Sequence, residues 1–372
     1  MANFSKKLSF CLLFLLVVLL AVAVAWWGII QLQWPIWLGA SMGAGVIACF
    51  LFILFLKKYL IRRREKKLVT KIVDQGEIID ENAVPDQLLI KELERNWASN
   101  LALLRSSQLR RKGNPIYALP WYLTLGAAGM GKSTAVSNSG LPASFTEVEQ
   151  NNEVRPTRNC DWWFLDKAIV LDTAGRYSIP FEGMVDQDEW KRFLSLLTRH
   201  RKKEPLNGIL LFISADALTD VAADMLRKQG QFFRNRINNL MRTIGHKIPV
   251  RLIVTKMDAV PGFAGFANSV KPLARGQVMG YWNRKANPFW QEVVTEAMRE
   301  TGERLRELRM RHVCDESRPE PDCLMFPVSF EELHTGLRSF LEPVFSENRF
   351  QETPYLAGIY FGSGQCAAPS SL

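Results

Sequence analysis

The sequence predicts an α/β protein in which an N-terminal pair of transmembrane helices precedes a doubly wound, mostly parallel sheet. Three observations lead to this prediction. Residues 8–56 contain no Asp, Glu, Lys, Arg or His, short apolar runs alternate with helical patterns after residue 116, and a glycine-rich motif follows the first of those runs. The uncharged stretch excludes a wholly soluble protein. No other uncharged stretch approaches the roughly 20 residues of a helical span, which excludes a polytopic channel.

The uncharged stretch is too long for one membrane crossing. Its 49 residues would extend about 73 Å as a helix, more than twice the thickness of a hydrocarbon core. The Gln-Leu-Gln-Trp-Pro sequence at residues 31–35 predicts a break, with helices at 8–30 and 36–56 and tryptophans clustered at the interface. Residues 1–56 are therefore assigned to a transmembrane hairpin. Gly39 and Gly43 either allow the two helices, or two copies of the protein, to approach closely or reflect the frequency of glycine in membrane helices, and a homo-oligomer is expected.

Much of the positive charge follows this hairpin directly. The chain has a net charge of +10, and residues 57–67 contain seven Lys or Arg and one Glu. Basic residues at this position orient a hairpin with both ends in the cytoplasm and attract anionic headgroups. The location of these basic residues favours a role in setting the membrane orientation of the chain. No nucleic-acid partner is expected. Cleavage of the first helix as a signal peptide, after the Ala-Val-Ala at 23–25, is an alternative that leaves the remaining chain in the cytoplasm.

The rest of the chain divides into a linker, a main domain and a tail. Residues 57–115 form a basic juxtamembrane linker, whose apolar residues recur at helical spacing from Ile90 to Leu104. Residues 116–350 form the main domain, because strand and helix patterns alternate there as in a parallel sheet covered on both faces. Residues 351–372 are assigned to a tail. Strands are expected at 121–125, 162–165, 168–171, 208–214, 249–255 and 323–328. Helices are expected at 188–200, 216–243 and 288–311, and a last helix is expected between the strand at 323–328 and about residue 345.

A phosphate-binding motif follows the first strand of the main domain. Residues 126–133 match G-x-x-x-x-G-K-[ST]. Glycines permit a tight loop with inward-facing amides, Lys132 is predicted to reach the β and γ phosphates, and Ser133 to bind Mg²⁺. Because the motif lies between a predicted strand and a predicted helix, it indicates a P-loop NTPase-like domain. The expected cofactor is Mg²⁺ with GTP or ATP.

Two further motifs lie at later strand ends, and their order is GTPase-like. Asp172 and Gly175 form a D-x-x-G motif, in which the aspartate can hold Mg²⁺ and the glycine amide can sense the γ-phosphate. Residues 255–258 (Thr-Lys-Met-Asp) resemble the N-K-x-D motif that recognises guanine, and residues 327–329 occupy the place of the last GTPase motif. Open α/β sheets bind ligands at such strand ends.

The predicted site residues follow from these motifs. Lys132, Asp172 and the switch-like Thr157 are assigned to catalysis, and Ser133 and Asp172 to Mg²⁺. Arg155, Arg158 and Arg176 are candidate γ-phosphate contacts or solvated side chains. The residues assigned to nucleotide binding are Gly126, Gly129, Gly131, Lys132, Ser133, Thr134, Gly175, Thr255, Lys256 and Asp258.

Each motif has a plainer interpretation. Asp172 could start an ordinary turn, Thr157 could be an ordinary loop residue, and residues 255–258 could form a simple strand-to-helix connection. Thr255 replaces the usual Asn, which weakens the preference for guanine over adenine. Arg176 replaces the Gln that orients water in many GTPases, which predicts slow hydrolysis or a different arrangement of the site.

Taken together, these segments resemble the IcmF-like (TssM) inner-membrane component of bacterial type VI secretion systems. The resemblance is carried by the N-terminal hairpin, the run Thr-Arg-Asn-Cys-Asp-Trp-Trp-Phe at 157–164, residues 120–122, 171–177, 255–263 and 275–280, and residues 354–361. It implies a multi-pass protein of the inner membrane whose main domain is cytoplasmic. Its implied partners are the lipid bilayer, a second inner-membrane component, a lipoprotein and the cytoplasmic baseplate.

The resemblance also frames the functional hypotheses. The first is a membrane anchor with an NTP-dependent switch domain. The second is a structural scaffold with a vestigial or purely stabilising nucleotide site, which Arg176 and Thr255 favour. The resemblance implies that the P-loop is intact in some family members and degraded in others. A third is an unrelated membrane-bound GTPase. Family members continue into a further membrane helix and a periplasmic region, whereas residues 365–372 no longer resemble the family. The sequence is therefore interpreted as a fragment or a truncated product.

Overall fold

A computed structural model of the chain describes residues 85–142, 160–177, 185–270, 277–315, 321–348 and 351–364. The chain divides into two compact units, Met1–Ile79 and Asp80–Leu372, and every described residue belongs to the second. The predicted transmembrane hairpin and the basic segment after it lie outside the described residues. Within the described ranges, no helix has both the length and the apolar character that a membrane crossing requires.

The second unit is built on a seven-stranded sheet with the order β2-β3-β1-β4-β5-β7-β6. Neighbours among β1, β3, β4, β5 and β7 pair in parallel, whereas β2 and β6 are antiparallel edge strands. The predicted α/β, mostly parallel sheet is confirmed. The strands are β1 (Trp121–Leu125), β2 (Cys160–Leu165), β3 (Ala168–Thr173), β4 (Gly208–Ser214), β5 (Pro249–Thr255), β6 (Met279–Trp282) and β7 (Tyr355–Phe361).

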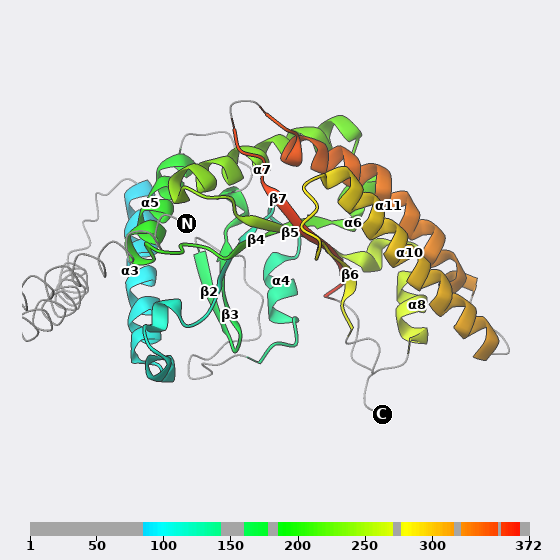
Figure 1. Ribbon diagram of the computed structural model, residues 1–372, viewed down its shortest axis with the longest axis horizontal. Helices are drawn as coiled ribbons and strands as arrows, with labels where there is room; N and C mark the ends of the chain where they lie inside the picture. The colour runs from blue at the N-terminus through cyan, green and yellow to red at the C-terminus, as the bar shows by residue number, and fades with distance from the viewer. Residues whose placement is uncertain are drawn as a thin grey trace, which may run out of the picture. The chain divides into compact units, whose positions relative to one another are not determined.

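Helices cover both faces of this sheet, but unequally. Figure 1 shows α7 and α11 on one side and the short α4 on the other. The α-helices are α3 (Pro85–Ser106), α4 (Lys132–Ser137), α5 (Val185–His200), α6 (Ala215–Asp220), α7 (Ala223–Ile244), α8 (Phe263–Ser269), α10 (Trp290–Asp315) and α11 (Pro321–Phe345). The 3-10 helices within the described residues are η2 (Gln108–Lys112), η3 (Pro115–Tyr117), η4 (Gly175–Tyr177) and η5 (Met257–Ala259).

The local sequence explains most of these elements. Along α7, Leu226, Phe233, Ile237 and Leu240 recur at helical spacing and are fully buried, so one stripe of the helix faces the core. The helix ends at Gly245, whose left-handed φ of 79° lets its N–H reach the carbonyl of Met241. The predicted helix at 216–243 is nevertheless two helices, because residue 221 adopts an extended conformation between α6 and α7.

An aromatic cluster attaches α3, part of the predicted linker, to the sheet. The Trp97 ring lies 4.9 Å from Trp162 and 5.5 Å from Phe193, both in edge-to-face contact, and 6.5 Å from Trp121. Such pairs add stabilisation beyond the area they bury. The unusual Trp-Trp sequence at 162–163 therefore has a packing role at Trp162, where β2 meets α3.

The C-terminal third differs most from the sequence prediction. The strand expected at 323–328 is wrong, because these residues lie inside α11. Phe326, Phe330, Leu333 and Leu337 are fully buried at helical spacing, and a short apolar run alone does not distinguish a strand from a buried helix. Conversely, residues 355–361, expected in a tail, form β7 between β5 and β6. The boundary expected at residue 350 thus leaves out a strand of the sheet.

A pH dependence of stability follows from the end of α5. His200 is half-buried, and burial, with the charges of Arg105 and Arg199, lowers its pKa from 6.5 to about 4. Between these values the unfolded chain binds a proton that the folded chain does not. The contribution of His200 to the free energy of unfolding should therefore fall as pH drops from 6.5 toward 4. Urea unfolding at several pH values gives the free energy of unfolding as a function of pH. Between pH 4 and 6.5 this free energy should change less with pH in His200→Gln than in the unmodified chain, and the same pH dependence in both would contradict this assignment.

Candidate functional site

The P-loop lies at the carboxyl end of β1 and depends on glycine. Gly129 and Gly131 have φ values of 77° and 71°, in the left-handed region that a side chain disfavours. A Cβ at Gly126 would lie 2.9 Å from Cβ of Phe212 and 3.1 Å from Cδ of Lys132. The loop therefore has the left-handed turns of backbone segments that bind anions, and it leaves room for Lys132 to cross it.

Lys132 folds back over this loop. Its side chain is only 7% exposed, and Nζ donates hydrogen bonds to the carbonyl oxygens of Gly126 at 2.7 Å and Ala127 at 3.1 Å. Burial lowers the pKa of Lys132 from its ordinary value, while the negative charge of Asp172 partly opposes that shift. The ammonium group is thus held beside the backbone that would surround a phosphate.

Asp172 lies at the end of β3, fully buried, between two hydroxyl groups. Ser133 Oγ donates to Oδ2 at 2.5 Å, and Thr124 Oγ1 donates to Oδ1 at 2.7 Å. Hydroxyl and carboxylate oxygens are the hard ligands that Mg²⁺ prefers. The predicted pair of Ser133 and Asp172 is brought together, and its donor set fits Mg²⁺. Thr124 was not predicted, because an apolar strand rarely signals one functional threonine.

The remainder of the D-x-x-G segment rests on the P-loop. A Cβ at Gly175 would lie 2.3 Å from the backbone nitrogen of Ala128, so glycine is needed for this approach. The next residue, Arg176, forms an ion pair of 2.9 Å with the buried Glu189 of α5. Arg176 is thus engaged by α5, whereas Thr157, Arg155 and Arg158 lie outside the described residues.

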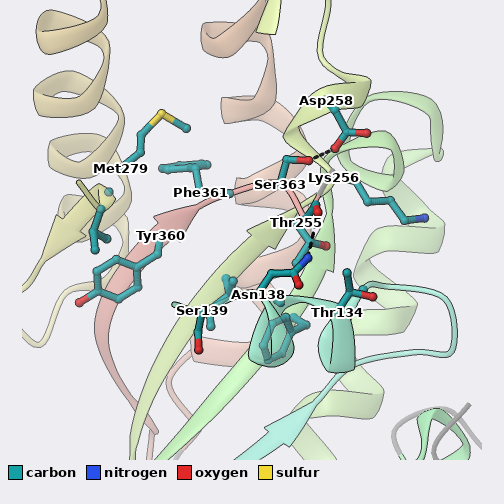
Figure 2. Close-up of a pocket in the computed structure, with 18 of the residues that line it drawn as sticks. Thr134, Asn138, Ser139, Thr255, Lys256, Asp258, Met279, Tyr360, Phe361 and Ser363 are labelled. Atoms are coloured by element: carbon teal, nitrogen blue, oxygen red, sulfur yellow. Dashed lines mark hydrogen bonds between the residues drawn. The ribbon is translucent and has the colours of Figure 1, made fainter. Parts of the chain in front are cut away.

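The third motif joins the P-loop from β5. Thr255 Oγ1 donates to the carbonyl oxygen of Met130 at 2.7 Å, which links the end of β5 to the loop. Lys256 has a left-handed φ of 53° and forms an ion pair of 3.4 Å with Asp216. Asp258 accepts a hydrogen bond from Ser363, which lies outside the three motifs and was not predicted as a site residue. Figure 2 shows Thr134, Thr255, Lys256 and Asp258 around one pocket.

All three motifs line a single cavity of about 1320 Å³. Its lining includes residues 128–134 and Asp258, together with residues of α8 and α10. The assignment of residues 327–329 to the last GTPase motif is wrong, because these residues are in α11 and Ser329 is buried in the helix packing. The loop after β7, at residues 362–364, lines the cavity instead.

The strand order and the loop at residues 126–133 define an α/β protein with a glycine-rich loop at the carboxyl end of β1. The family model for the IcmF-related N-terminal domain matches residues 184–371. The chain is 35% identical over 284 residues to the "Type VI secretion system component TssM1" of Pseudomonas aeruginosa strain PAO1, in a match that covers 73% of this chain and 26% of that protein. The chain therefore belongs to the IcmF-related family, and it spans about a quarter of this relative's length.

Two solved structures of nucleotide-binding proteins also match. The "Signal recognition particle receptor SRb-GTP/SRX complex" from Chaetomium thermophilum is 18% identical, with coverage of 38% of this chain and 70% of that one and a TM-score of 0.25. A "probable GTP-binding protein engB" is 16% identical, with coverage of 37% and 71% and a TM-score of 0.25. At this TM-score neither similarity supports a functional conclusion.

Proposed function

We propose that this chain is an inner-membrane component of a type VI secretion system whose main domain is an NTP-dependent switch. Membership of the IcmF-related family supports the assignment to the secretion system. The observation that carries the switch is the convergence of Lys132, the Ser133–Asp172 pair and Gly175 on one loop. These are the groups that nucleotide-dependent switches use to bind phosphate and Mg²⁺.

Each residue has a defined task in this proposal. Lys132 exchanges its carbonyl hydrogen bonds for phosphate oxygens, and the glycines at 126, 129 and 131 let backbone amides approach the same group. Ser133 and Asp172 hold Mg²⁺. Magnesium nucleoside triphosphate supplies a cleavable phosphoanhydride and a γ-phosphate, whose presence the backbone at Gly175 senses. Thr157 is proposed as a further switch contact, and Thr134 as a phosphate contact beside Ser133.

Hydrolysis at this site is expected to be slow. Water-activating GTPases place a Gln after the D-x-x-G motif, whereas this chain has Arg176. The Arg176 guanidinium is bound to Glu189 with two N···O distances of 3.0 and 2.9 Å. A group held in this way does not orient an attacking water. The site is therefore better suited to a binding switch than to rapid turnover.

The remaining parts of the proposal concern the membrane and the partners. The hairpin at residues 1–56 is proposed to anchor the chain in the inner membrane, with residues 57–115 as linker and the sheet-containing domain in the cytoplasm. The proposed partners are a second inner-membrane component, a lipoprotein, the baseplate and further copies of this chain. The Pseudomonas relative named above supports this assembly through its designation as a secretion-system component.

Replacing Lys132 with alanine tests the nucleotide site. The full chain in detergent should bind fluorescent GTP or ATP analogues saturably and with dependence on Mg²⁺. Loss of the Lys132 charge should weaken this binding by about 100-fold or more, because charge-assisted contacts to phosphate are among the strongest polar interactions. Lys228→Ala, an exposed lysine of α7, is the matched control and should bind normally. Equal affinity of both variants would rule out the proposed site.

A structural scaffold with a vestigial site is the second candidate. It is favoured by the internal hydrogen bonds that already engage Lys132, Ser133 and Thr255 with protein atoms. A secretion assay separates the two functions. Full secretion by a Lys132→Ala, Asp172→Asn double variant that accumulates normally would favour the scaffold, and loss of secretion would favour the switch.

A further inference from the structure

The chain that leaves β7 forms one wall of the candidate nucleotide site. The Gly362 N–H donates to the carbonyl oxygen of Val254 at 2.9 Å, and the Met257 N–H donates to the Gly362 carbonyl at 3.3 Å. These bonds continue the β5–β7 pairing past the end of both strands. Residues 362–364 are thereby held beside residues 255–258, the segment that resembles a base-recognition motif.

This wall also reaches the P-loop helix. Asn138 Nδ2, at the end of α4, donates to the carbonyl oxygen of Gly364 at 2.9 Å. A Cβ at Gly364 would lie 2.7 Å from Cγ2 of Thr134, so the backbone runs close against α4. Residues 362–364, which line the cavity, therefore connect the end of β5 with α4. Figure 2 shows Ser363 with its hydroxyl directed at Asp258, and Asn138 nearby.

The hydrogen bond between Ser363 and Asp258 controls the orientation of the carboxylate. Ser363 Oγ donates to Oδ1 of Asp258. An exposed aspartate otherwise rotates freely, and a carboxylate engaged at one oxygen still has further acceptor capacity. The Asp258 carboxylate lines the cavity that also contains Lys132 and Ser133. It can therefore accept hydrogen bonds from the base of a nucleotide whose phosphates lie on the P-loop.

An oriented carboxylate distinguishes the purine bases. Guanine presents two adjacent donors, N1–H and the exocyclic 2-amino group, which together match a carboxylate. Adenine has an acceptor at N1 and no amino group at C2, so it leaves the carboxylate unpaired. A site built around a polar group rejects a ligand that cannot pair with it far more strongly than an apolar pocket does.

We propose that Ser363 is a positioning residue that makes the site selective for guanine over adenine nucleotides by orienting Asp258. This inference rests on the proposed nucleotide binding and specifies its base. Thr255, which weakened the sequence-based preference for guanine, instead secures the loop through its bond to Met130. Base selection is thus assigned to Asp258 and Ser363, which lie 105 residues apart in the sequence.

The test is a titration of the full chain in detergent with fluorescent GDP, ADP and XDP in the presence of Mg²⁺. The unmodified chain should bind GDP at least about tenfold more tightly than ADP. Ser363→Ala should weaken GDP binding about tenfold, because losing one hydrogen bond to a charged group changes an affinity by about that factor. ADP binding should be unchanged. Ser363→Thr retains the hydroxyl and should restore GDP binding. Asp258→Asn should shift preference toward XDP, whose C2 carbonyl accepts from the amide.

Controls separate this inference from the proposed function. Ser346→Ala removes a hydroxyl that donates to its own helix at Glu342, and it should leave all three affinities unchanged. If nucleotide binding depends on Lys132 but Ser363→Ala and the unmodified chain have the same ratio of GDP to ADP affinity, the role of Ser363 is overturned and the proposed nucleotide binding stands. Absence of Lys132-dependent binding of any nucleotide would overturn both the proposed function and this inference.

Discussion

Replacing Gly336 with alanine is expected to lower the free energy of unfolding by about 3 kcal/mol, because an added methyl group overpacks a helix contact. Gly336 lies in α11 where it meets α6. A Cβ at this position would lie 2.1 Å from the carbonyl oxygen of Leu218 and 2.9 Å from its carbonyl carbon. Neither atom can rotate away, since both belong to the backbone. The two helices must therefore separate.

Thermal denaturation of the detergent-solubilised chain measures this effect. For a unit of this size, a loss of about 3 kcal/mol corresponds to a decrease in Tm of about 5 °C. Gly302→Ala in α10 is the matched control, because a Cβ there meets no atom within 4 Å. Alanine is the better helix former, so the control should be neutral or gain up to about 1 kcal/mol. Equal melting temperatures for the two variants would contradict the α6–α11 contact.

Replacing Gly175 with alanine is expected to disconnect the D-x-x-G segment from the P-loop. The new Cβ would lie 2.3 Å from the nitrogen and 2.6 Å from the Cα of Ala128, and 2.9 Å from the carbonyl carbon of Ala127. The segment must then move outward by an ångström or more. Because Asp172 lies three residues earlier, its alignment with Ser133 is expected to be lost with it.

The readout is again the Mg²⁺-dependent titration of the full chain. A misplacement of about 1 Å can lower the rate of an enzyme about 100-fold. We expect a loss of nucleotide affinity of the same order in Gly175→Ala. Gly302→Ala serves as the control here also, because Gly302, unlike its neighbour Thr301, does not line the cavity and a Cβ there meets no atom within 4 Å. Unchanged affinity in Gly175→Ala, with an unchanged Tm, would show that the segment does not rest on the loop.

The parts of the site that lie within short stretches of sequence were predictable. The spacing of Gly126, Gly129 and Gly131 before Lys132 specifies a loop that only glycine can form, and φ values of 77° and 71° at two of these positions agree with that reasoning. The pairing of Ser133 with Asp172 followed from the position of each residue at the end of a strand or loop. Parallel strands bring their carboxyl ends to one edge, so neighbouring strands suffice to predict that contact.

Contacts between distant segments were not predictable in the same way. Ser363 lies in a Gly-Ser-Gly sequence that indicates a loop but not the partner of that loop, and its bond to Asp258 depends on β7 lying between β5 and β6. The pairing of Arg176 with Glu189 depends on the placement of α5 across the end of η4. The erroneous strand at 323–328 has the same origin, because a six-residue apolar run fits a strand or a buried helix equally well.

The amino-acid sequence by itself determined the phosphate loop, the D-x-x-G motif, the alternation of strands and helices, and the resemblance to the IcmF-like family. These depend on residue types at short separations, where backbone geometry restricts the choice. Only the tertiary structure decided that β7 belongs to the sheet, that Thr255 bonds the loop at residues 126–133, and that Ser363 donates a hydrogen bond to Asp258. Such contacts depend on which distant segments bury their apolar faces together, and local spacing does not encode that choice.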